Sequence, residues 1–138
     1  TIEADMKRIL CFIMFCLAAS GCTYNLAAWL PPPRAESGDA ARGDDIFHHG
    51  WNDAPPCSSC HQTRLGATGF ALGPNLADVS ERATNRVAGL TAAAYLRQSI
   101  LDPHAYVVPG FRDIMYPQYA AHLDDQAVDD LIAYLQSL

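Results

Sequence analysis

Five consecutive residues of this 138-residue chain form a chemically distinctive pattern: Cys57, Ser58, Ser59, Cys60 and His61. Two thiols separated by two residues and followed at once by a histidine are typical of c-type haem attachment. Each thiol can form a thioether with one haem vinyl group, and the adjacent imidazole can then bind the iron. The pattern predicts one covalent haem c, attached through Cys57 and Cys60, with His61 as the proximal ligand.

Two other kinds of site use closely spaced cysteines, and the sequence disfavours both. A structural zinc site takes four cysteine or histidine ligands from two spaced pairs, and the chain has no second pair. A thioredoxin-like redox pair would accompany a βαβ pattern, and no clear alternating strands follow the amino-terminal segment. Haem attachment therefore remains the leading interpretation of Cys57 and Cys60.

The second axial ligand of the iron decides which chemistry is available. A methionine favours electron transfer, whereas an open position allows ligand binding or peroxide chemistry. Of the three methionines, Met6 and Met14 lie within the first thirty residues, which have the features of an export segment. Met115 lies in an irregular, proline-bounded stretch that could bring its side chain to the haem, so we expect it to be the distal ligand. His104 and His122 are the alternatives.

The first thirty residues have the features of an export signal. Lys7 and Arg8 precede an apolar run over residues 9–19, and small residues lead to Cys22. This order is typical of a secretory signal, and its ending resembles the lipobox of bacterial lipoproteins, whose new amino-terminal cysteine carries a lipid. Residues 9–30 lack charge and could instead span about 33 Å as one membrane helix. Plain secretion is a third possibility.

All three interpretations place the rest of the chain outside the membrane, because basic residues before an apolar run stay on the inner side. Residues 1–30 are thus predicted to be an export signal or anchor, and the proline-led residues 31–42 an extended linker. Residues 43–138 have the length of one domain. The net charge of −6, from nine basic and fifteen acidic residues, argues against a nucleic-acid partner.

The folded part is predicted to be mostly helical, with helices at about 38–49, 92–101 and 124–137 and no convincing strand. The last helix has the clearest signals, since Asp124 is a good N-cap and apolar residues follow at helical spacing. Residues 62–90 show little regular pattern. A haem would supply the apolar core that such a stretch lacks, so we expect four apolar side chains to be buried around it: Leu65, Phe70, Leu72 and Leu76.

Taken together, residues 43–138 resemble class I, mitochondrial-type cytochrome c domains. The resemblance rests on Gly43-x-x-x-Phe47, Cys57 to His61, Gly73-Pro74-Asn75-Leu76, Met115, and Leu131 to Leu135. It implies three or more helices wrapped around one haem, with the carbonyl of Pro74 accepting a hydrogen bond from the proximal histidine. It also implies that the first and last helices cross at Gly43, Phe47 and Tyr134.

Three further residues are candidates for contacts with the haem propionates, with ordinary surface or core roles as the alternative: Arg82, Tyr95 and Tyr106. Many members of the family have proline directly after the ligand methionine, whereas this chain has Tyr116 there.

Residues 95–111 resemble haem domains attached to respiratory complexes, such as the monohaem lipoprotein subunit of alternative complex III. This resemblance implies a partner complex. With His61 and Met115 filling both axial positions, we expect an electron relay rather than an enzyme in its own right. The amino-terminal segment predicts that it lies on the periplasmic side of a bacterial cell membrane. Its expected partners are other redox subunits of a respiratory or photosynthetic complex and a downstream acceptor. The alternative function is a haem sensor or peroxidase-like protein whose sixth ligand position is open or labile.

Overall fold

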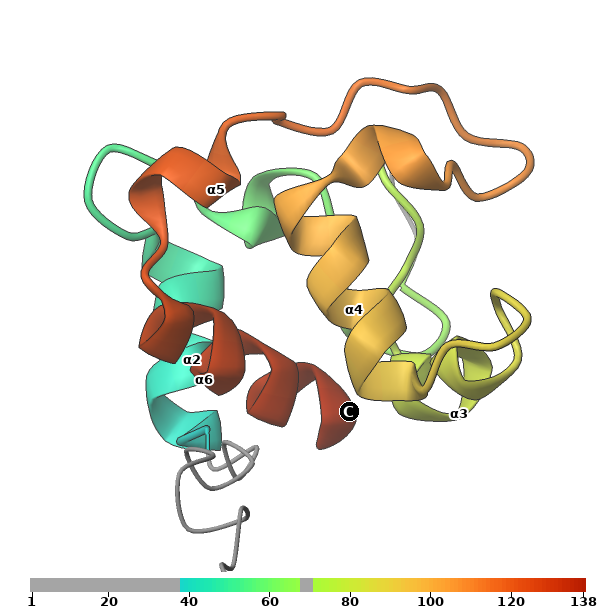
Figure 1. Cartoon of the computed structure of the whole chain (residues 1–138), viewed down its shortest axis with the longest axis horizontal. Coiled ribbons are helices and arrows are strands. Elements are labelled where there is room, and N and C mark those ends of the chain that lie inside the picture. The colour runs from blue at the N-terminus through green and yellow to red at the C-terminus, as the bar shows by residue number, and fades with distance from the viewer. Residues whose placement is uncertain (1–37, 68–70) are drawn as a thin grey trace, which may run out of the picture. The chain divides into compact units, whose positions relative to one another are not determined.

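The computed structural model describes residues 38–67 and 71–138. The predicted export segment with Cys22, and most of the predicted linker, lie outside these residues. The described part contains five α-helices: α2 (Ala40–His49), α3 (Val79–Thr84), α4 (Ala92–Leu101), α5 (Tyr119–His122) and α6 (Asp125–Gln136) (Figure 1). Two 3₁₀ turns, Cys57–Ser59 and Pro103–Ala105, complete the regular structure.

The mostly helical class is confirmed, and the three predicted helices agree with the structure to within two residues. Asp39, Thr91 and Asp124 cap α2, α4 and α6 by accepting backbone N–H groups of the first turn. The helices α3 and α5 were not predicted. They contain only six and four residues, too few for a helical repeat of apolar positions to become visible.

The helices α2 and α6 cross closely because Gly43 has no side chain. A Cβ atom at Gly43 would lie 2.0 Å from the carbonyl oxygen of Asp130 and 2.8 Å from the Cβ of Tyr134. One turn further along, the rings of Phe47 and Tyr134 pack with their centroids 5.3 Å apart. The expected crossing at Gly43, Phe47 and Tyr134 is therefore present.

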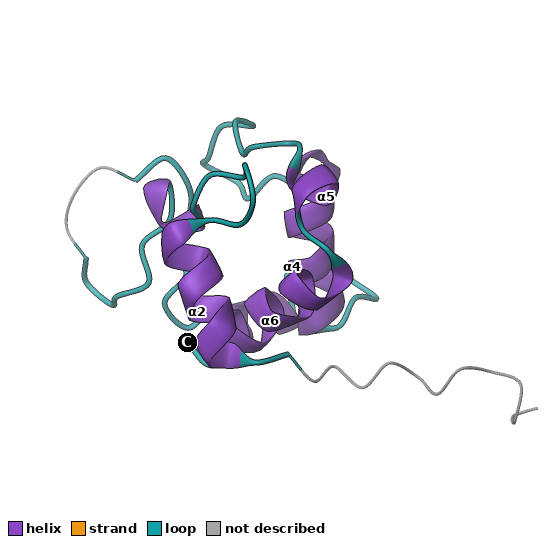
Figure 2. Ribbon diagram, turned by 90° about the vertical axis from the view of Figure 1, so that its left-hand side faces the viewer, coloured by secondary structure: helices purple, strands orange, loops and turns teal. Residues whose placement is uncertain are grey.

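The core lies between α2, α4 and α6. In Figure 2, the helices α2, α6, α4 and α5 follow one another around one side of the described part. The stripe predicted on α6 is fully buried, and it consists of Val128, Leu131, Ile132 and Leu135. Helix α4 is also joined to α6 by an ion pair between Arg97 and Asp129. The packed helices α2, α4 and α6 hold the ends of the non-helical segments in place.

The predicted burial of the apolar residues in 62–90 is only partly correct. Leu76 is half-buried against the core, but Leu65 is 77% exposed and Leu72 is 43% exposed. Leu65 lies in a surface turn closed by the N–H of Ala67 on the carbonyl of Arg64, so its side chain points outward. Phe70 lies outside the described residues.

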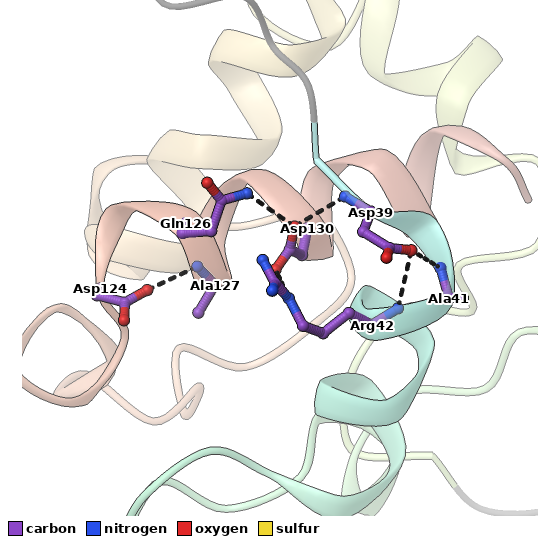
Figure 3. A network of polar contacts seen from close by, with 7 residues as sticks. All are labelled: Asp39, Ala41, Arg42, Asp124, Gln126, Ala127 and Asp130. Atoms are coloured by element: carbon purple, nitrogen blue, oxygen red, sulfur yellow. Dashed lines mark hydrogen bonds and ion pairs between the residues drawn. The ribbon is translucent and has the colours of Figure 1, made fainter.

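One fully buried carboxylate ties the start of α2 to α6. Asp130 accepts hydrogen bonds from the backbone N–H of Asp39 (2.8 Å), the amide of Gln126 (3.0 Å) and the guanidinium of Arg42. Figure 3 shows Asp130 between these three donors. Burial by itself would raise the pKa of Asp130, but the three donors outweigh it and hold the pKa below its ordinary value.

We expect Asp130→Asn to lower the free energy of unfolding by about 1–2 kcal/mol at neutral pH, because the amide loses the charge-assisted bond to Arg42. The folded pKa of Asp130 lies below the ordinary 3.8, so its stabilisation is complete above that pH and is lost as the pH falls through the folded pKa. Denaturant unfolding should show the difference between wild type and variant shrinking below about pH 4. The exposed Asp53→Asn is the control, and a difference that persists in acid would contradict this account.

Candidate haem site

An apolar cavity of about 1210 Å³, counting the solvent in its mouth, lies among the helices. Side chains from all five α-helices and Pro103 form part of its wall, and three segments outside the α-helices, 55–61, 72–76 and 106–116, contribute the remainder. The apolar lining suits a large, apolar cofactor.

The residues of the Cys-x-x-Cys-His pattern come together at this cavity. The 3₁₀ turn Cys57–Ser59 is closed by the N–H groups of Cys60 (3.1 Å) and His61 (3.0 Å), which both donate to the carbonyl of Cys57. Cys57, Cys60 and His61 all line the cavity. Both thiols are free, so the turn presents two thiols and one imidazole to the same space.

His61 is held in one orientation and one tautomer. Its Nδ1 lies 2.8 Å from the carbonyl oxygen of Pro74, so Nδ1–H donates and Nε2 keeps a lone pair free for a metal. Gly73 packs against the ring, where a Cβ atom would lie only 2.4 Å from Cε1 of His61. Burial lowers the pKa of His61 more than the bond to Pro74 raises it, which favours the neutral imidazole that metals bind.

Of the three distal candidates, only Met115 lines the cavity. His104 is paired with Asp113, and His122 contacts Tyr116. The structure therefore brings Met115 and His61 to the same cavity and places both histidine alternatives outside its lining.

Of the three residues predicted to contact the haem propionates, two line the cavity and one does not. Tyr95 and Tyr106 line the cavity and pack edge to face, with ring centroids 5.9 Å apart. Arg82 does not line it, because its guanidinium donates to the backbone carbonyls of Asn75 (2.7 Å) and Ala77 (2.6 Å). Arg82 thus closes the turn before α3 and is not brought to the cavity.

Tyr119 is a site residue that the sequence analysis missed. It is buried in α5, lines the cavity, and donates its hydroxyl to the carbonyl of Pro55 at 3.0 Å. Burial raises the pKa of Tyr119, and burial also raises the pKa of the neighbouring Cys57 thiol to about 11. No periodic signal marked Tyr119 in the sequence, because α5 has only four residues.

This arrangement fits a haem better than a bare metal ion. Within residues 38–67 and 71–138, no cluster of three or more histidine, cysteine or acidic side chains could hold an ion. A haem needs only a covalent anchor, one or two axial donors and an apolar wall, and the cavity provides all of them.

The comparison with protein families agrees with this geometry. Residues 40–138 match the family described as Cytochrome c. The chain belongs to the cytochrome c family. It is a haem-based electron-transfer protein, and its cofactor is one haem c attached through Cys57 and Cys60. A search of curated proteins gave no match.

Within residues 38–67 and 71–138 of this cytochrome c, no helix has both the length and the apolar character needed to cross a membrane.

Proposed function

We propose that this cytochrome c relays single electrons with His61 and Met115 as the two axial ligands. The observation that carries the proposal is that both side chains line one cavity, with His61 already fixed by Pro74. A haem with both axial positions filled supplies one-electron transfer and offers no open position to a substrate. The chain is therefore a carrier and not an enzyme in its own right.

The residues of the chain have separate tasks in this relay. Cys57 and Cys60 hold the cofactor in place, so that it is not lost when the charge of the iron changes. Pro74 and Gly73 keep the His61 ring in one position, which reduces the rearrangement that each transfer requires. The apolar wall, including Leu96 of α4, excludes water from the cavity.

We place this relay at the outer face of a bacterial membrane, as a subunit of a respiratory or photosynthetic complex similar to alternative complex III. The basic start, the apolar run and Cys22 support the anchor. The excess of acidic over basic residues supports a fixed subunit, because a diffusing carrier of the lysine-rich kind uses a cationic surface to find its partners. Electrons would come from neighbouring redox subunits and pass to a downstream acceptor.

The anchor is tested by Cys22→Ala in the full chain, expressed in a bacterium that attaches haem c. We expect wild type to incorporate a labelled fatty acid and to remain with the membrane, and the variant to lose the label, because lipidation requires that thiol. The control is Cys16→Ala, which removes a thiol from the apolar run and should keep the label. An unlabelled wild type that stays in the membrane would contradict the lipid anchor and favour a retained helix.

A further inference from the structure

The segment that carries Met115 has little backbone support. Residues 107–118 connect the turn Pro103–Ala105 to α5 and are drawn in orange between α4 and α5 in Figure 1. Among the described residues, the backbone hydrogen bonds of 107–117 are both local, from Phe111 to Val108 (3.1 Å) and from Ile114 to Arg112 (3.0 Å). Side chains must therefore tie this segment to the helices.

The first tie lies on the amino-terminal side of Met115. Nδ1 of His104 lies 2.7 Å from the carboxylate of Asp113, and both side chains are about half exposed. His104 belongs to the 3₁₀ turn that follows α4, which is closed by the N–H of Ala105 on the carbonyl of Asp102 (3.1 Å). This contact links the residue two positions before Met115 to the end of α4.

The second tie lies on the carboxyl-terminal side of Met115. The hydroxyl of Tyr116 lies 3.2 Å from Nε2 of His122 and 3.2 Å from the side-chain oxygen of Gln118. Both hydrogen bonds form together when Nε2–H of His122 donates to the tyrosine oxygen and the tyrosine hydroxyl donates to Gln118. The ring of Tyr116 also packs edge to face on that of Tyr119, at 5.0 Å.

Helix α5, which contains His122, is itself held in place by hydrogen bonds to residues before Cys57. The amide of Asn52 donates to the backbone carbonyl of His122 (2.9 Å), and the hydroxyl of Tyr119 donates to the carbonyl of Pro55 (3.0 Å). Two hydrogen bonds thus join α5 to the stretch just before Cys57. Through Tyr116, the Met115 segment is connected to the same stretch that presents the haem-binding thiols.

We infer that the His104–Asp113 and Tyr116–His122 contacts are two latches that hold Met115 in the cavity. This inference rests on the proposed role of Met115 as distal ligand. All four side chains are positioning residues, since they lie outside the ligand set and act through the backbone on either side of it. Each contact favours the arrangement with Met115 inside over arrangements in which the segment swings away.

Imidazole binding to the oxidised, full-length haem protein tests the latches. Imidazole competes with Met115 for the iron, so its apparent affinity rises with the fraction of molecules whose Met115 segment has opened. We expect Asp113→Ala and Tyr116→Phe each to tighten imidazole binding about two- to fivefold, the usual size for a partly exposed polar contact. Asp113→Asn should restore much of the wild-type affinity, because the amide oxygen still accepts from His104.

Double variants show whether each contact acts as a pair. His104→Ala should tighten imidazole binding as much as Asp113→Ala, and the variant with both changes should gain no more than either alone. The exposed Glu81→Ala, on α3, removes one negative charge from a residue that takes part in neither contact and should leave the affinity unchanged. Denaturant unfolding of the same variants separates a general loss of stability from an opening of the segment.

Two results would overturn the inference in distinguishable ways. If Met115→Ala binds imidazole far more tightly than wild type while Asp113→Ala and Tyr116→Phe match wild type, Met115 is the ligand but the latches do not hold it. If Met115→Ala matches wild type, Met115 does not occupy the iron. The proposed ligand set then fails, and the latches fail with it.

Discussion

Replacing Met115 by alanine should make the reduced protein bind carbon monoxide rapidly and should lower its midpoint potential by on the order of 0.1 V or more, since axial ligands set haem potentials over about 0.8 V. A thioether raises the potential of the iron and fills its sixth position, and alanine does neither. Flash photolysis measures the rate of carbon monoxide binding, and a redox titration measures the potential.

The neighbouring variant Ile114→Ala is the matched control for Met115→Ala. Ile114 also lines the cavity and is 45% exposed, but its side chain has no donor atom for iron. It should bind carbon monoxide as slowly as wild type. A wild type that already binds carbon monoxide as fast as Met115→Ala would contradict the relay and favour the sensor or peroxidase-like alternative.

Gly73→Ala should disturb the proximal side as severely as Met115→Ala disturbs the distal side. The added methyl group would lie 2.4 Å from Cε1 and 2.8 Å from Nδ1 of His61, so either the ring or the backbone must move. Either movement breaks the 2.8 Å bond from His61 to the carbonyl of Pro74. We expect the covalent haem content per polypeptide to fall roughly tenfold, the lower range for loss of support around a metal ligand.

Gly89→Ala is the control for this second prediction. Gly89 has a φ of +84°, so alanine there strains the backbone, but nothing lies within 4 Å of the added methyl group. It should cost some stability and leave the haem content near that of wild type. If Gly73→Ala and Gly89→Ala retain haem equally well, the packing of Gly73 on His61 is not what positions the imidazole.

The proximal half of the site could be predicted because its parts are close in sequence. Cys57, Cys60 and His61 fall within five residues, so one turn determines their arrangement. Helix α6 could also be predicted, because its twelve residues are enough for both an apolar stripe and the capping residue Asp124 to be recognised. The pairing of Pro74 with His61 came from the family resemblance, and the structure contains that bond.

Met115 could be proposed from the sequence, but the other side chains around the cavity could not be predicted in the same way. Whether a tyrosine or an arginine reaches the cavity depends on the path of the loops, and Arg82 bonds to its own turn while Tyr119 reaches the cavity from a four-residue helix. The partners His104 and Asp113 are nine residues apart, with no periodic pattern between them. Contacts of this kind follow from tertiary packing, and composition or spacing does not reveal them.

The most direct test of the account is the absorption spectrum of the oxidised, full-length protein purified from membranes, followed by the spectrum after reduction. We expect a weak sulfur-to-iron band towards the red end of the oxidised spectrum, absent in Met115→Ala, together with reduced bands of low-spin haem c. An oxidised wild-type spectrum without that band would contradict axial ligation by Met115 and the electron relay that depends on it.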